Sequence, residues 1–144
     1  MGASREGGCI CGDVRFRAAE PLRTVNLCHC TECRTMAGGA SGFTACDADG
    51  FELLSEGDLR WFAGPTSATG GERAFCGRCG SYLLFRIPGD PLLYFSASAL
   101  DDETGIVAEA HIFWESRGPW EPADDSLPKI EGYGADGLDA LYGN

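Results

Sequence analysis

The sequence of 144 residues has no hydrophobic run that approaches the roughly 18–20 apolar residues of a membrane span. It also has no basic stretch, and its formal net charge is −11. A chain this acidic is repelled by phosphate backbones and by anionic membranes, so we expect neither nucleic acid nor membrane as a partner. Residues 1–6 lack the apolar run of a signal peptide, which predicts a cytoplasmic location.

The sequence lacks the alternation of strands and long helices that marks a parallel α/β fold, and it contains no internal repeat. Its 21 glycines suit a protein with many turns. Short apolar segments between Gly, Pro and Asp residues predict strands at 13–17, 43–46, 51–54, 59–62, 73–75, 82–87, 92–96 and 110–114, and residues 25–27 lead into the cluster at Cys28. A helical turn is expected at 31–36, and irregular coil from Arg117 onward.

These elements predict a mainly β fold, an antiparallel sheet or a barrel-like sandwich built from short strands. The length predicts one domain over residues 1–144, with its core within 7–128.

Eight cysteines stand in this chain, most of them in tight clusters. In a reducing compartment, clustered cysteines are more often metal ligands or catalytic groups than disulfide partners. Cys28, Cys30 and Cys33 form a C-x-C-x-x-C motif. An extended backbone points Cys28 and Cys30 to the same side, and a turn can return Cys33 to them. Three thiolates leave the fourth position of a tetrahedral zinc ion open, which is typical of a catalytic site.

The other cysteine pairs predict a closed zinc site. Cys9 and Cys11 with Cys76 and Cys79 supply four thiolates, and glycines in and after the second pair allow a tight knuckle. Spacing alone leaves other groupings open, including a structural role for both sites with water or Cys46 as the last ligand. The simplest interpretation of Cys46 is a small buried strand residue. A thioredoxin-like redox role is disfavoured, because a strand-like segment follows the second pair where that motif needs a helix.

Three polar residues near these motifs are candidates for supporting roles. His29 alternates away from the metal of its neighbours, which predicts a position at the surface or behind the ligands. His111 is expected either as a buried, hydrogen-bonded histidine or as the proton-transfer group of the open site. Arg34 either faces water or steadies an anionic substrate by bidentate contact.

Four motifs occur in order along residues 8–128. They are G-x-C-x-C-G-x-V from Gly8, C-H-C-x-x-C-R from Cys28, F-C-x-x-C-G from Phe75, and the segment that begins His-Ile-Phe-Trp at His111. Together they resemble the motifs of the glutathione-dependent formaldehyde-activating enzymes, a family also called the centromere-protein-V-like domain.

This resemblance implies an antiparallel β-tent fold with two zinc ions per chain. It implies a structural site at Cys9, Cys11, Cys76 and Cys79 and a catalytic site at Cys28, Cys30 and Cys33, which agrees with the grouping by spacing. It also implies a carbon–sulfur lyase whose reaction joins glutathione and formaldehyde to give S-hydroxymethylglutathione.

The chemistry of three thiolates agrees with that activity. A site of one Zn²⁺ ion and three thiolates has a net charge of −1. We therefore expect this zinc ion to acidify a bound water less than zinc held by three histidines does. It can still bind an incoming thiol as thiolate. We therefore expect zinc-dependent addition of a small thiol, nominally glutathione, to formaldehyde or another small aldehyde. The catalytic residues expected are Cys28, Cys30, Cys33, Arg34 and His111. The alternative is a non-catalytic binding module stabilised by zinc.

Overall fold

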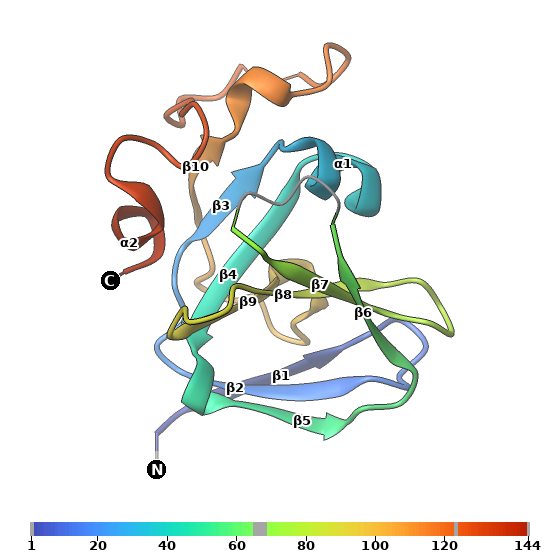
Figure 1. The fold of residues 1–144 in the computed structure, drawn as a ribbon. Helices are drawn as coiled ribbons and strands as arrows, with labels where there is room; N and C mark the ends of the chain where they lie inside the picture. Colours follow the sequence, from blue (N-terminus) through green and yellow to red (C-terminus); the bar gives the residue numbers. More distant parts are fainter. Residues whose placement is uncertain (1, 65–68, 123, 144) are drawn as a thin grey trace.

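The computed structural model describes residues 2–64, 69–122 and 124–143, and two β-sheets form the body of the molecule (Figure 1). The smaller sheet has three strands in the order β1-β2-β5, and the larger has seven in the order β10-β3-β4-β9-β8-β7-β6. The bounds are β1 Ser4–Gly8, β2 Arg15–Ala19, β3 Val25–Cys28, β4 Ser41–Asp47, β5 Phe51–Ser55, β6 Leu59–Ala63, β7 Glu72–Cys76, β8 Tyr82–Arg86, β9 Leu92–Ser96 and β10 Ala108–Ile112. The described residues also form two short α-helices, α1 (Thr31–Ala37) and α2 (Gly137–Tyr142), and three single-turn 3-10 helices at Ala48–Gly50, Ala97–Ala99 and Trp114–Ser116.

The described strand pairings are antiparallel except for one, because β10 runs parallel to β3, with Ile112 opposite Cys28. After β9 the chain passes along the smaller sheet, where the Asp101 amide donates to the Glu6 carbonyl at 3.0 Å. The chain therefore enters β10 at the end of the sheet where β3 begins, so β10 runs beside β3 in the same direction. The mainly β fold is confirmed, and this parallel pair is the departure from a purely antiparallel arrangement.

The predicted strands and the helical turn are confirmed, with bounds shifted by two residues at most. Strand β1 was not expected, because its sequence has no apolar alternation. It forms through the close approach that its glycines allow: a Cβ at Gly7 would collide with the Ala99 carbonyl oxygen. The expectation of irregular coil after Arg117 is wrong for α2, which packs Leu138, Leu141 and Tyr142 against the core.

The core has two main parts. Between the two sheets, the ring of Phe16 of β2 stacks on Phe51 and packs at a tilt against Phe95, with centroid distances of 5.2 Å each. Cys46 is fully buried in this cluster, which confirms its prediction as a small buried strand residue. A second cluster, rich in aromatic rings, joins the larger sheet to α2 and consists of Phe43, Ala45, Phe85, Tyr94 and Tyr142. This second cluster forms one side of the site described below.

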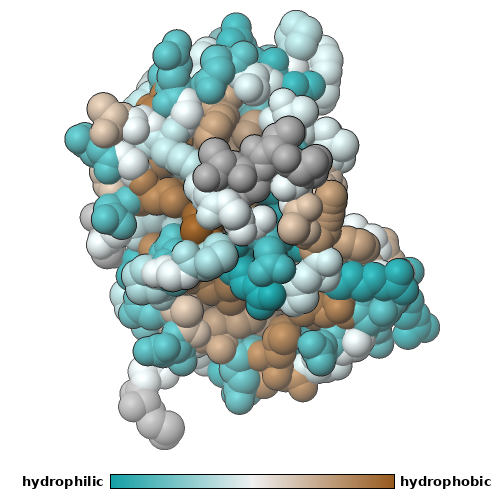
Figure 2. Space-filling model, viewed as in Figure 1, coloured by the Kyte–Doolittle hydropathy of each residue, from teal (hydrophilic) through white to brown (hydrophobic). Residues whose placement is uncertain are grey.

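Apolar side chains also reach the surface on the face shown in Figure 2, around β5, where Leu53 and Leu54 are 37% and 40% exposed. Within the described parts of the chain, no helix combines the length and the apolar character needed to cross a membrane.

Candidate functional site

The two predicted cysteine groups are both brought together by the fold. The first lies where the turn after β1 meets the end of β7, and we call it the four-sulfur site: Cys9, Cys11, Cys76 and Cys79. All four sulfurs lie within 4.8 Å of one another, with 3.5 Å between Cys9 and Cys11 and 3.8 Å between Cys11 and Cys76. Zn–S bonds of about 2.3 Å place tetrahedral sulfurs roughly 3.8 Å apart, so this set fits a zinc ion.

Hydrogen-bond donors around the four-sulfur site favour thiolates. The Val14 amide donates to the Cys9 sulfur at 3.2 Å, and the Ser81 hydroxyl lies 3.2 Å from the Cys79 sulfur. The Ser81 side chain is the main cause that lowers the pKa of Cys79 to about 5. Gly80, with φ of +81°, closes the knuckle by donating its amide to the Cys76 carbonyl at 2.7 Å. The donors thus favour the thiolate form of Cys9 and Cys79, which a metal ion requires.

The second group, the three-sulfur site, lies between the end of β3 and the start of α1. Cys28 ends β3, Cys30 is the N-cap of α1, and Cys33 stands in its first turn. The Cys33 amide donates to the Cys30 sulfur at 3.3 Å, so the same bond caps the helix and orients a ligand. The three sulfurs lie within 4.8 Å of one another, and Cys28 and Cys33 are buried.

The three thiols of this site oppose one another's ionisation. Hydrogen bonds from Cys28 and Cys33 lower the pKa of Cys30 to about 2, and the hydrogen bond with Cys30 in turn raises the pKa of Cys28 well above its usual value. Hydrogen bonding among the sulfurs thus favours the thiolate of Cys30 and disfavours that of Cys28. A soft divalent cation such as Zn²⁺ would allow three thiolates at once, and the sulfur distances fit it. Among the described residues, no other Cys, His, Asp or Glu completes this set.

A cavity of about 30 Å³ adjoins the three sulfurs. Its walls are mostly aromatic and include two residues of α2. The lining consists of Cys28, Cys30, Cys33, Phe43, Arg73, Phe85, Tyr94, Ile112, Tyr133, Leu138 and Tyr142. The volume is roughly that of one or two water molecules, so the cavity has room for a molecule of the size of formaldehyde, whereas most of a tripeptide would lie outside it.

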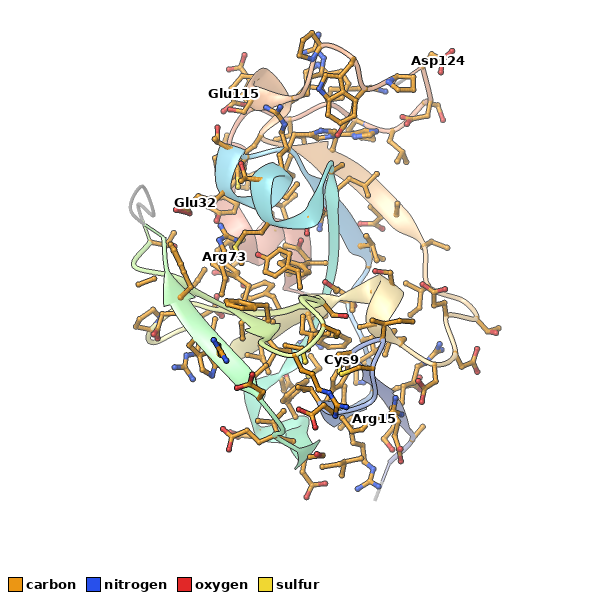
Figure 3. All side chains as sticks on the ribbon, turned by 90° about the vertical axis from the view of Figure 1, so that its right-hand side faces the viewer. Cys9, Arg15, Glu32, Arg73, Glu115 and Asp124 are labelled. Atoms are coloured by element: carbon orange, nitrogen blue, oxygen red, sulfur yellow. The ribbon has the colours of Figure 1, made fainter. Side chains whose placement is uncertain are left out.

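Arg73 is the functional candidate that the sequence did not reveal. It lies on β7, its side chain is only 7% exposed, and its guanidinium points toward α1 and Glu32 (Figure 3). Nη1 donates to the Cys33 sulfur at 3.3 Å and to the Tyr82 hydroxyl at 2.5 Å, while Nη2 lies 3.9 Å from the Cys30 sulfur. An arginine in a short strand is usually a surface residue, so no sequence signal distinguished it.

His29 is buried, so the alternative of a surface position for it is wrong. Its Nε2 lies 2.8 Å from Nδ1 of His111, and its Nδ1 lies 3.1 Å from Oε2 of Glu121. Nε2 of His111 lies 2.9 Å from Oδ2 of Asp125. These four side chains join the segment after β10 to the three-sulfur site, and Trp114 packs its ring edge-on against both imidazoles.

Arg34 extends from α1 away from the cavity. Its Nη1 donates to the Ser116 carbonyl at 2.7 Å, which ties α1 to the turn after β10. Neither Arg34 nor His111 is among the described residues that line the cavity. Substrate steering by Arg34 and proton transfer by His111 stay predictions.

The comparison with known families agrees with this geometry. Residues 4–116 match the model of the glutathione-dependent formaldehyde-activating enzymes. The chain belongs to this family. A curated relative from Halomonas elongata, which carries the name of such an enzyme provisionally, is 34% identical over 122 residues, covering 80% of this chain and 78% of the relative.

The fold also has a counterpart among solved structures. A crystal structure of a Rhodobacter sphaeroides protein has a TM-score of 0.55 at 20% identity, and the match covers 72% of this chain and 97% of that one. At 20% identity this similarity supports the fold of our protein, but it says nothing about the substrate.

Proposed function

We propose that this protein catalyses the addition of a small thiol to formaldehyde or another small aldehyde, with glutathione as the nominal thiol, and is thus a carbon–sulfur lyase in the reverse direction. The observation that carries the proposal is the three-sulfur site, a ligand set one short of four that faces a small cavity lined mostly by aromatic side chains. A second, complete set of four sulfurs lies elsewhere in the fold, so a structural zinc ion does not need the three-sulfur site.

The residues of the chain suit this reaction. When bound at Cys28, Cys30 and Cys33, Zn²⁺ would supply a fourth position at which a thiol ionises to its nucleophilic form. The aromatic walls keep water from the aldehyde and hold its carbonyl carbon close to the sulfur. A C–S bond forms while the π bond of the carbonyl breaks, and the carbonyl oxygen takes up one proton for the one that the thiol loses. No oxidant or reductant is needed.

The histidine pair offers a path for that proton. His29, between two of the three cysteines, contacts His111, which contacts Asp125 at the surface, where the side chain is 45% exposed. We propose that His111 moves protons along this chain of contacts rather than by touching the substrate, because it does not line the cavity among the described residues. For Arg34, anchored on the Ser116 carbonyl, the proposal is that it helps to steer an anionic substrate toward the site.

Metal content gives the first test. We expect two zinc ions per chain in protein purified without chelator, because both sulfur sets have zinc-like spacing. Elemental analysis by plasma mass spectrometry checks this number. If the protein holds one zinc ion per chain and binds no second ion after dialysis against zinc, the three-sulfur site is not a zinc site.

Exchange NMR of formaldehyde with glutathione gives the second test. We expect the zinc-loaded protein to accelerate the exchange between free and thiol-bound formaldehyde above the spontaneous rate, since the addition also proceeds without a catalyst. Cysteine methyl ester and 2-mercaptoethanol, run in parallel, report whether the thiol must be glutathione. Without acceleration by any of these thiols, in protein confirmed to hold both ions, the non-catalytic module would be the better description.

A further inference from the structure

Arg73 is a buried cation that contacts two sulfurs of the three-sulfur site as well as Tyr82 and Glu32. Its side chain is 7% exposed, and a buried charge is strongly unfavourable unless it is paired and hydrogen-bonded. The Phe85 ring covers one side of the guanidinium, with the centroid 4.6 Å from its central carbon. Solvent therefore does little to screen this charge.

The groups around Arg73 identify its partner. The Tyr82 hydroxyl accepts from Nη1 but stays neutral, because burial raises the pKa of that phenol. Glu32 supplies a carboxylate oxygen at 3.5 Å from Nη2, which is longer than a strong charge-assisted hydrogen bond. The Cys33 sulfur, at 3.3 Å from Nη1, is within ordinary reach of an N–H donor to sulfur. Arg73 is therefore directed at the three-sulfur site.

The charges of that site complete the argument. Three thiolates around a divalent ion have one net negative charge, and Arg73 adds one positive charge beside them. We propose that Arg73 is the charge partner of the three-sulfur site, where its guanidinium balances the thiolates and favours an anionic fourth ligand over a neutral one.

The consequence is a preference for thiolates. With Arg73 in place, a divalent ion, four thiolates and this guanidinium have one net negative charge together, and without Arg73 they have two. Glu32, which also pairs with Arg73, adds one negative charge in both cases. At about 4 Å in a partly buried setting, one unit charge changes such a preference by roughly tenfold or more. The proposal makes Arg73 a positioning and specificity-determining residue, and it rests on the fourth-ligand chemistry proposed above.

The test uses the cobalt-substituted protein, because tetrahedral cobalt–thiolate sites have visible absorption that changes with the fourth ligand. 2-Mercaptoethanol is titrated as the anionic ligand and imidazole as the neutral one. For Arg73→Gln we expect the affinity for 2-mercaptoethanol to fall roughly tenfold or more relative to that for imidazole. Arg73→Lys, which keeps the charge, should retain most of the preference. An equal loss for both ligands, or no loss, overturns the inference.

Arg86→Gln is the matched control. Arg86 lies on β8, its guanidinium stacks on the Trp61 ring at 3.7 Å, and its Nε contacts Glu72 at 3.1 Å, away from both sulfur sets. Its removal should leave the ligand preference unchanged. Should Arg73→Gln not fold, Arg73→Lys still decides, because a folded lysine variant without the thiolate preference contradicts a charge role.

Metal retention separates this inference from the proposed function. If cobalt in the wild-type protein binds no thiol, the proposed function fails, but a charge partner must still stabilise the metal. We then expect Arg73→Gln to lose cobalt from the three-sulfur site at lower chelator concentration than the wild type, with the four-sulfur site unchanged. Equal retention in the two proteins would contradict the charge role, whatever the activity.

Discussion

Replacement of Cys76 by alanine is expected to leave the chain largely unfolded. The four-sulfur site joins the turn after β1 to the end of β7, segments that are separated by 65 residues between Cys11 and Cys76. Structural zinc contributes about 10–16 kcal/mol of binding free energy in small peptides, whereas domains are stable by about 5–15 kcal/mol. Loss of this ion therefore suffices to unfold the domain. Circular dichroism and thermal melts measure the effect.

Cys46→Ala is the control for the loss of a buried sulfur. Cys46 is fully buried in the core but belongs to neither sulfur site. The small cavity left by this substitution should lower the free energy of unfolding by about 1–2 kcal/mol, and thermal unfolding should stay cooperative. If Cys76→Ala melts as cooperatively as Cys46→Ala and at the same temperature, the four-sulfur site is not what holds these segments together.

The cysteine groups could be predicted from the sequence because metal ligands cluster and their spacing is set by local geometry. Within each motif, period-two alternation or a tight turn brings the sulfurs together, as for Cys28 and Cys30. The strands were predictable for a similar reason, since alternation and turn residues are local signals.

The surroundings of the three-sulfur site depend on contacts that are distant in sequence. Arg73 reaches Cys33 across 40 residues, and His29 meets His111 across 82. Nothing in the local pattern around Arg73 differs from that of an exposed strand arginine. Helix α2 was missed because its six residues are too few for a periodic signal, and it forms only because Tyr142 is buried against Tyr94.

The contacts around the two sites support the proposed division into a structural and a catalytic site. The four-sulfur site has a complete set of four sulfurs, and hydrogen-bond donors hold Cys9 and Cys79. The three-sulfur site instead has an empty side that faces aromatic walls and a buried cation. Loss of a ligand should therefore have different consequences at the two sites.

Cys30→Ala is expected to abolish the acceleration of thiol addition while the chain stays folded. The variant removes one of three ligands, so two sulfurs remain and the site should lose its ion, giving one zinc per chain. It also removes the bond from the Cys33 amide that caps α1, at a cost of about 1 kcal/mol, which lowers the melting temperature by a few degrees only. Exchange NMR, zinc analysis and a thermal melt on one preparation measure all three effects. Cys46→Ala, with both sulfur sites intact, should keep wild-type acceleration and two zinc ions. Acceleration that survives in folded Cys30→Ala protein with one zinc ion would place the chemistry outside the three-sulfur site.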